Sequence, residues 1–158
     1  MNYTSYLLKI IIIFISCIFS LSVSAETIKY TGTVSGHPVK HLMPLGNGDA
    51  VLTMQSIGVI ALSGTPPTIN TMKCSGLGYQ TVEDKTTTDF YCNIAENDED
   101  SFDIKGTASE VNNEADGSFN VIGGSGKWKG ATGKGKFIRY DKTDTANKMY
   151  LEMEITSP

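Results

Sequence analysis

The chain has 158 residues, with 13 Lys and Arg against 17 Asp and Glu and a formal net charge of −4. This length is that of one ordinary domain. An acidic chain without a basic block argues against binding to nucleic acids or to anionic membrane surfaces, because both need clustered cations.

The first 25 residues have the pattern of an export signal. Lys9 precedes an apolar run, Ile10 to Phe19, and Val23 and Ala25 occupy the third and first positions before a possible cut. A signal peptidase accepts short residues at these two positions, so the sequence predicts cleavage between Ala25 and Glu26.

Two alternatives to a cleaved signal fit the sequence less well. A membrane anchor needs roughly 20 apolar residues, and the stretch from Leu7 to Val23 is shorter and contains Lys9. A lipoprotein would be cut before Cys17, but the bulky Phe14 is a poor match to a lipobox. We therefore expect a secreted or periplasmic protein that does not insert into a membrane after cleavage.

The expected mature chain, residues 26–158, forms a single domain. It holds 12 Lys and Arg against 17 Asp and Glu, a net charge of −5. Near its start, His37 and His41 lie four residues apart, and on a helix they could share a zinc ion. Pro38 and the neighbouring glycine favour a surface loop instead, and no third ligand is evident.

Apolar and polar residues alternate with a period of two through most of the mature chain, which is typical of half-buried antiparallel strands. Two longer apolar stretches indicate more buried strands, the first bent at Gly58 and the second with a bulge or bend at Gly76 and Gly78. No window shows a helical stripe. The segments with strand character are 27–34, 49–62, 69–81, 90–95, 102–105, 118–121 and 149–156.

Turn-forming residues separate these segments at 45–48, 63–67, 96–100 and 112–117. Counting gives about eight short strands. The expected fold is therefore all-β, an antiparallel closed barrel of about eight strands, since closure removes the aggregation-prone edges of a sheet.

The mature chain keeps two cysteines, Cys74 and Cys92. An even pair in an exported chain predicts a structural disulfide, and the wide spacing argues against a metal-binding or catalytic thiol pair. The acidic run from Glu96 to Asp103 could bind calcium, but it lacks the central glycine and terminal Glu of an EF-hand. A solvated hairpin turn is the favoured interpretation.

The most distinctive stretch runs from Val121 to Phe137 and is rich in glycine. Its glycines permit positive φ and close approach of two strands. Trp128 would then cover a barrel end as an apolar plug, or alternatively stack on a ligand. The part from Gly130 to Lys136 has the spacing of a phosphate-binding loop. However, Phe137 replaces the magnesium-binding Ser or Thr, and no strand–loop–helix context is evident.

Residues 123–133, Gly-Gly-Ser-Gly-Lys-Trp-Lys-Gly-Ala-Thr-Gly, resemble a segment of the allene oxide cyclases and the related dirigent proteins. Upstream, Cys74, the Gly-rich strand after it, Cys92 and the acidic turn at 97–100 resemble the layout of bacterial allene-oxide-cyclase-barrel-like proteins. The resemblance implies an eight-stranded antiparallel barrel. It covers most of the mature chain but carries over no polar pocket residue of those enzymes.

Three functions remain open. The first is a non-enzymatic exported barrel that binds a small apolar ligand or a protein, in its interior or on its loops. The second, implied by the resemblance, is a cyclase-like or dirigent-like enzyme that steers a hydrophobic substrate. The third is a structural or host-interaction role at the cell surface. The sequence carries no Gly-x-Ser-x-Gly nucleophile motif and indicates no cofactor and no metal.

Overall fold

The structure is a computed structural model, and it describes residues 25–64, 67–112, 114–143 and 146–158. The predicted export signal, apart from Ala25, lies outside the described residues.

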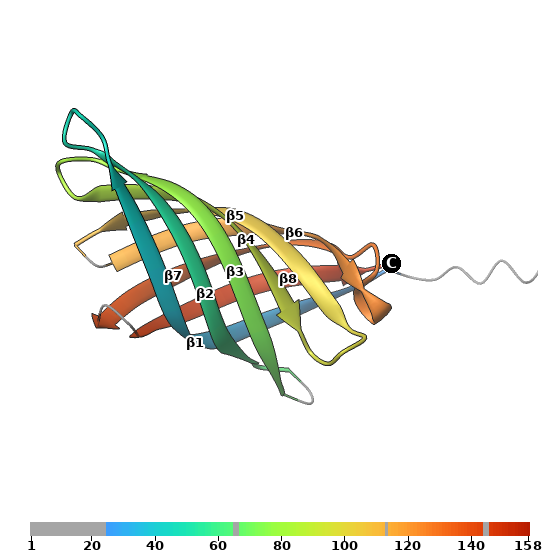
Figure 1. Cartoon of the computed structure of the whole chain (residues 1–158). Coiled ribbons are helices and arrows are strands. Elements are labelled where there is room, and N and C mark those ends of the chain that lie inside the picture. The colour runs from blue at the N-terminus through green and yellow to red at the C-terminus, as the bar shows by residue number, and fades with distance from the viewer. Residues whose placement is uncertain (1–24, 65–66, 113, 144–145) are drawn as a thin grey trace, which may run out of the picture.

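Eight antiparallel strands form a single closed barrel, which confirms the predicted fold class (Figure 1). Each strand pairs with the next along the chain, and β8 returns to pair with β1. The strands are β1 (Glu26–Pro44), β2 (Ala50–Leu62), β3 (Thr68–Gln80), β4 (Lys85–Ala95), β5 (Ser101–Val111), β6 (Glu114–Ser125), β7 (Thr132–Thr143) and β8 (Ala146–Ser157).

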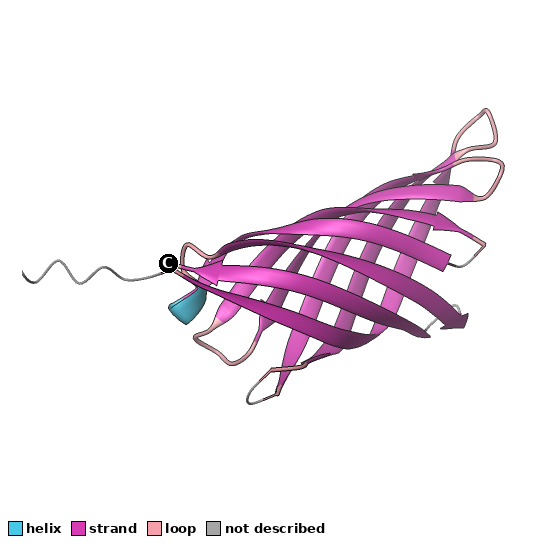
Figure 2. Ribbon diagram, turned by 180° about the vertical axis from the view of Figure 1, so that it is seen from behind, coloured by secondary structure: helices cyan, strands magenta, loops and turns pink. Residues whose placement is uncertain are grey.

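The two ends of the barrel differ in their connections. The β1–β2, β3–β4, β5–β6 and β7–β8 connections lie at one end, called here the open end. At the other, the closed end, a short 3-10 helix η1 (Gly126–Trp128) joins β6 to β7 and lies beside the C-terminus (Figure 2). The β1–β2 and β3–β4 hairpins extend furthest at the open end (Figure 1).

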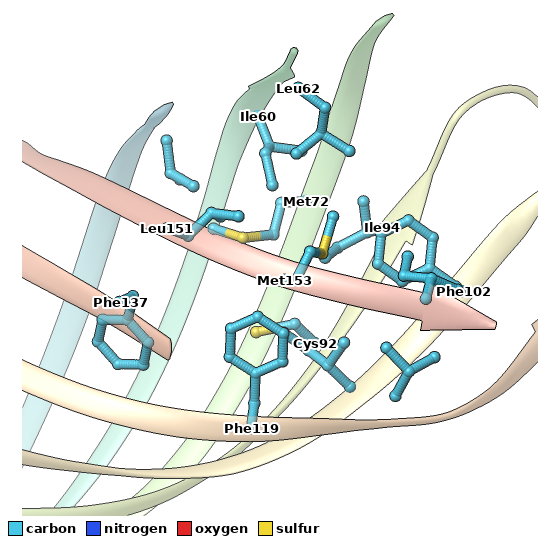
Figure 3. Close-up of a cluster of buried hydrophobic side chains, with 14 of the residues drawn as sticks. Ile60, Leu62, Met72, Cys92, Ile94, Phe102, Phe119, Phe137, Leu151 and Met153 are labelled. Carbon is cyan, nitrogen blue, oxygen red and sulfur yellow. The ribbon is translucent and has the colours of Figure 1, made fainter. Parts of the chain in front are cut away.

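The period-two pattern places apolar side chains inside the barrel and polar ones outside. The inward positions of all eight strands contribute to one hydrophobic cluster, which includes Ile60, Ile94, Phe119, Phe137 and Met153 (Figure 3). Removing these side chains from water is the main favourable term in folding. The fold therefore follows from the alternation that the sequence displays.

Large and small side chains alternate around the inside of the barrel. One row of directly paired inward positions reads Gly76, Phe90, Gly106, Phe119 and Gly135. A Cβ added at Gly106 would lie 2.6 Å from Phe90 Cζ, and one at Gly135 would lie 2.6 Å from Phe119 Cε2. The glycines thus create the space that the aromatic rings fill, as interdigitated packing requires.

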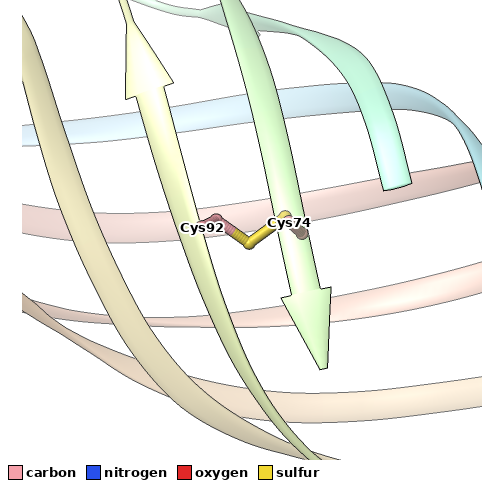
Figure 4. The surroundings of a disulfide bond; sticks show 2 residues. All are labelled: Cys74 and Cys92. Atoms are coloured by element: carbon pink, nitrogen blue, oxygen red, sulfur yellow. A yellow bond between two sulfur atoms is a disulfide. The ribbon is translucent and has the colours of Figure 1, made fainter. Parts of the chain in front are cut away.

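Cys74 and Cys92 are directly opposite each other on β3 and β4, with their Cα atoms 4.0 Å apart, and form the predicted disulfide (Figure 4). Both side chains face the interior and are buried. No described helix is long and apolar enough to cross a membrane.

Several local predictions were wrong. His37 and His41 lie within strand β1 and not in a loop, because β1 is 19 residues long and passes through Pro38. Pro38 is buried on the inward side, and the strand continues through it to Pro44. The β5–β6 connection is shorter than the predicted turn at 112–117, since β6 begins at Glu114.

A bulge or bend was predicted at Gly76 and Gly78 on β3, and the bulge is absent, because the pairing of β3 to β2 and β4 is regular at both glycines. Both glycines instead relieve crowding between strands: a Cβ at Gly78 would lie 2.7 Å from the backbone oxygen of Thr87. A register shift occurs instead between β5 and β6, where Asp103 pairs with Gly123 and Ile104 pairs with Val121, so that Ile122 is the extra residue on β6.

Candidate binding site at the open end of the barrel

Side chains fill most of the barrel interior. The cavity that remains has a volume of about 60 Å³ and is lined mainly by apolar residues, including Met54, Met72, Met149 and Met153. Pockets for drug-sized ligands have volumes of roughly 300–1,000 Å³. The interior as it stands is therefore too small for such a ligand.

Trp128 covers the closed end. Its side chain is 6% exposed and packs edge-to-face on Phe102, with ring centroids 5.5 Å apart. Gly124 makes room for it, because a Cβ there would lie 2.9 Å from Trp128 Cβ. The Asp100 carboxylate accepts a hydrogen bond from the backbone N–H of Lys127 (2.9 Å), which fixes the start of η1 and lowers the pKa of Asp100.

Three charged side chains meet inside the barrel near the open end. Lys40 Nζ of β1 donates to Glu110 Oε1 of β5 at 3.1 Å, and Arg139 Nη2 of β7 donates to Glu110 Oε2. Glu110 and Arg139 pair with opposite sides of β6 at the small residue Ala115. Ala115 thus allows the two long side chains to meet over it.

The ionisation of Glu110 follows from these neighbours. Burial alone would raise its pKa, but the charges of Arg139 and Lys40 and their hydrogen bonds outweigh burial, so the pKa lies below its ordinary value. Glu110 is therefore a carboxylate at neutral pH, and it links β1, β5 and β7 at this level of the barrel.

A polar pocket of about 160 Å³ lies on the outer side of this network, at the barrel mouth. Lys40, Leu52 and Glu110 line both this pocket and the interior cavity, so the network separates the two. Asp84 and Asn112, the non-glycine residues with positive φ in the described chain, also line the pocket. Asp and Asn are the residues that tolerate this conformation best.

Asp49 links the β1–β2 and β3–β4 hairpins at the open end. Its carboxylate accepts hydrogen bonds from the Tyr79 hydroxyl, from the backbone N–H of Val82 (3.0 Å) and from Asn47 Nδ2 (2.7 Å). The Tyr79 hydroxyl is the main cause of the lowered pKa of Asp49. These bonds hold the β1–β2 turn against the β3–β4 turn.

An exposed apolar surface lies beside the hydrogen bonds of Asp49, on the outer face of β1 to β3 and on the β3–β4 turn. We call it the open-end surface and define it by Met43, Leu77, Tyr79 and Val82, which are 60%, 59%, 41% and 68% exposed. Met43 pairs with Val51, and Val51 pairs with Tyr79, so these side chains are neighbours across three strands. A surface groove of about 590 Å³ continues from Leu77 and Tyr79 across β4 to β5.

The structure places the residues singled out in the sequence at separate positions. The disulfide lies inside the barrel, Trp128 at the closed end, and the acidic turn 96–100 at the same end. His37 and His41 share the outer face of an extended strand, where four residues span about 13 Å. The two histidines are therefore too far apart to chelate one ion together.

The glycine-lysine segment from Gly130 to Lys136 leads into strand β7 and not into a helix. It therefore lacks the helix N-terminus on which a phosphate-binding loop depends. Within the described residues, no group of three or more His, Cys, Asp or Glu side chains is arranged to hold a metal ion.

The sequence analysis missed the Lys40–Glu110–Arg139 network and the open-end surface. A signal for the network existed: Glu110 continues the inward alternation of Phe102, Ile104 and Ala108, and Arg139 follows Phe137 in the same phase. A charge at an inward position predicts a buried polar contact. The open-end surface had no such signal, because it depends on which strands are neighbours.

The chain was also compared with known proteins. It matches no model of a protein family, and no curated protein matches it. The comparisons therefore assign no family, and the fold rests on the strand pairing itself.

Proposed function

We propose that this protein is an exported, non-enzymatic binding module that binds a protein partner at the open end of its barrel. The observation that supports this most is the contrast between an interior cavity of about 60 Å³ and an exposed apolar surface on projecting hairpins. Loops and hairpin ends carried by a rigid scaffold are common binding elements.

A small apolar ligand inside the barrel is less well supported. Binding in a barrel requires an enclosed space, and here Phe90, Phe119 and Phe137 occupy the middle of it. The same reasoning applies to a cyclase-like or dirigent-like activity. The closed eight-stranded barrel and the glycine segment before β7 are compatible with that family, but they concern architecture and not chemistry.

Export is part of the proposal. Besides the signal pattern of residues 1–25, it is supported by the Cys74–Cys92 disulfide, because such bonds persist in oxidising compartments.

Site-specific photo-cross-linking in the native host tests the proposal. A photoreactive amino acid at position 82, on the open-end surface, is compared with one at position 122, an exposed isoleucine on β6. We expect a discrete protein adduct from position 82 and none from position 122. Equal adducts from both positions would contradict a site at the open end.

Native mass spectrometry of the purified protein provides the second arm. We expect the mass of the polypeptide with one disulfide and no small molecule. A stoichiometric small molecule that is lost on Ala108→Leu, which fills the interior cavity, would place the site inside the barrel and overturn the proposal.

A further inference from the structure

We infer that the partner segment recognised at the open end is basic and amphipathic, with apolar side chains flanked by lysine or arginine. This inference rests on the proposed function and specifies the chemistry of the partner. Three features of the open-end surface support it: its apolar patch, the sign of the charges around it and its rigidity.

The apolar part of the open-end surface is continuous. Val82 lies against the β1–β2 turn, since a Cβ at Gly48 would be 2.9 Å from Val82 Cγ1. Tyr79 and Leu77 extend the surface along β3 into the groove, whose other walls include the hydroxyl residues Thr87 and Thr107. Clustered exposed apolar side chains of this kind mark interaction sites more often than isolated ones do.

Carboxylates predominate around this surface. Asp89 is the charged residue among those lining the groove, and Asp49, Glu83 and Asp84 lie at the adjoining turns. The described cations nearby are Lys85, which binds Glu83 at 2.8 Å, Lys105, which lies over the Tyr91 ring, and Lys40 at the barrel mouth, which binds Glu110 at 3.1 Å. Complementary charge on a partner speeds association and selects its orientation.

The surface is also held in place before binding. The three hydrogen bonds to Asp49 fix the two hairpins relative to each other, and the Lys40–Glu110–Arg139 network joins β1, β5 and β7 below them. A partner therefore does not have to order these hairpins when it binds, which reduces the entropic cost of binding.

The same charges disfavour a lipid surface as the occupant. Exported proteins can place exposed apolar hairpins in a bilayer, but anionic headgroups would be repelled by Asp49, Glu83 and Asp84. Binding of the protein to phosphatidylcholine vesicles, measured beside binding of the peptides, tests this alternative.

Fluorescence anisotropy with synthetic peptides tests the inference on the full mature protein. The probe is a fluorescein-labelled peptide of alternating lysine and leucine, and the comparison peptide alternates glutamate and leucine. We expect the lysine peptide to bind with an affinity that falls as salt rises, and the glutamate peptide to bind at least tenfold more weakly.

Matched variants locate the binding. Glu83→Gln with Asp89→Asn removes two carboxylates at the open end, and Asp98→Asn with Glu99→Gln removes two exposed carboxylates at the closed end. We expect the first double variant to weaken binding of the lysine peptide about fivefold, as the loss of two exposed ion pairs implies. The second pair should change its affinity by less than twofold. Leu77→Asp should weaken the binding of both peptides.

Three results would overturn the inference. These are equal binding of the two peptides, an equal effect of the two double variants, and binding of phosphatidylcholine vesicles in preference to the lysine peptide. Failure here is distinguishable from failure of the proposed function. A protein adduct at position 82 without affinity for the lysine peptide would keep the open-end site and reject the basic partner.

Discussion

Breaking the Cys74–Cys92 disulfide should lower the stability of the folded barrel by about 3 kcal/mol. The two cysteines are 18 residues apart, and the chain-entropy model gives about 3 kcal/mol for a loop of this length at 25 °C. The β3–β4 hairpin pairs along its whole length without the bond. The effect therefore arises mainly from the greater freedom of the reduced unfolded chain.

Urea unfolding of the oxidised and the reduced wild-type protein measures this effect without changing the sequence. The variant Cys74→Ala with Cys92→Ala provides a second comparison that does not depend on reductant. For the 133 residues from Glu26 to Pro158, 3 kcal/mol corresponds to a fall in Tm of roughly 10 °C. Because both sulfurs are buried, the native protein should resist reductant until it unfolds.

The reasoning fails if reduction lowers the free energy of unfolding by less than about 1 kcal/mol with an unchanged m-value. That result would mean that the unfolded hairpin keeps its residual pairing, so that the disulfide removes little entropy. Rapid reduction of the bond under native conditions would contradict the burial of the two cysteines inside the barrel.

Three further predictions concern packing and charge. Gly135→Val should lower the free energy of unfolding in urea by about 1–3 kcal/mol because the added side chain collides with Phe119, whereas Gly46→Val, at a turn where an added Cβ has no neighbour within 4 Å, should change stability little. Trp128 is the chain's single tryptophan and is buried, so its emission should be blue-shifted and poorly quenched by acrylamide. Trp128→Ala should cost about 3–5 kcal/mol. The folded pKa of Glu110 is depressed, so its stabilising contribution is full above pH of about 4.3 and is lost as the pH falls through the folded pKa. Tm measured against pH should therefore fall more steeply in acid for the wild type than for Glu110→Gln.

The barrel could be predicted from the sequence because each strand is specified by a pattern within its own segment of the chain. Alternation of apolar and polar residues, as in 149–156, specifies a strand and its buried face without reference to any other segment. Closure followed from the number of strands and the need to avoid exposed edges. The disulfide was predicted from the export signal and from the even number of cysteines in the mature chain, and neither of these depends on the three-dimensional structure.

The errors arose where a residue has two common uses. Glycine in a strand indicates either a bulge or space for a neighbouring ring, and only the pairing of Gly76 with Phe90 decides between them. Proline argues against a strand interior because it removes a hydrogen-bond donor, yet β1 continues through Pro38. The open-end surface could not be predicted, because Met43 and Tyr79 meet only through the register of β1, β2 and β3.

The position of the Lys40–Glu110–Arg139 network bears on where the proposed site lies. Replacing a buried ion network by apolar residues is often neutral or stabilising, by about 1–4 kcal/mol. Stability alone therefore does not explain the charges of Lys40, Glu110 and Arg139 at inward positions. Elsewhere the described inward positions carry apolar residues, glycine and uncharged polar residues such as Ser56, Asn70, Thr86 and Thr88. The network lies at the boundary between the interior cavity and the mouth pocket, directly below the hairpins that carry the open-end surface. It joins strands from three parts of the barrel at that level, so it fixes the shape of the mouth where an apolar layer would allow several packings. One fixed shape at the open end is what the proposed binding site on those hairpins requires.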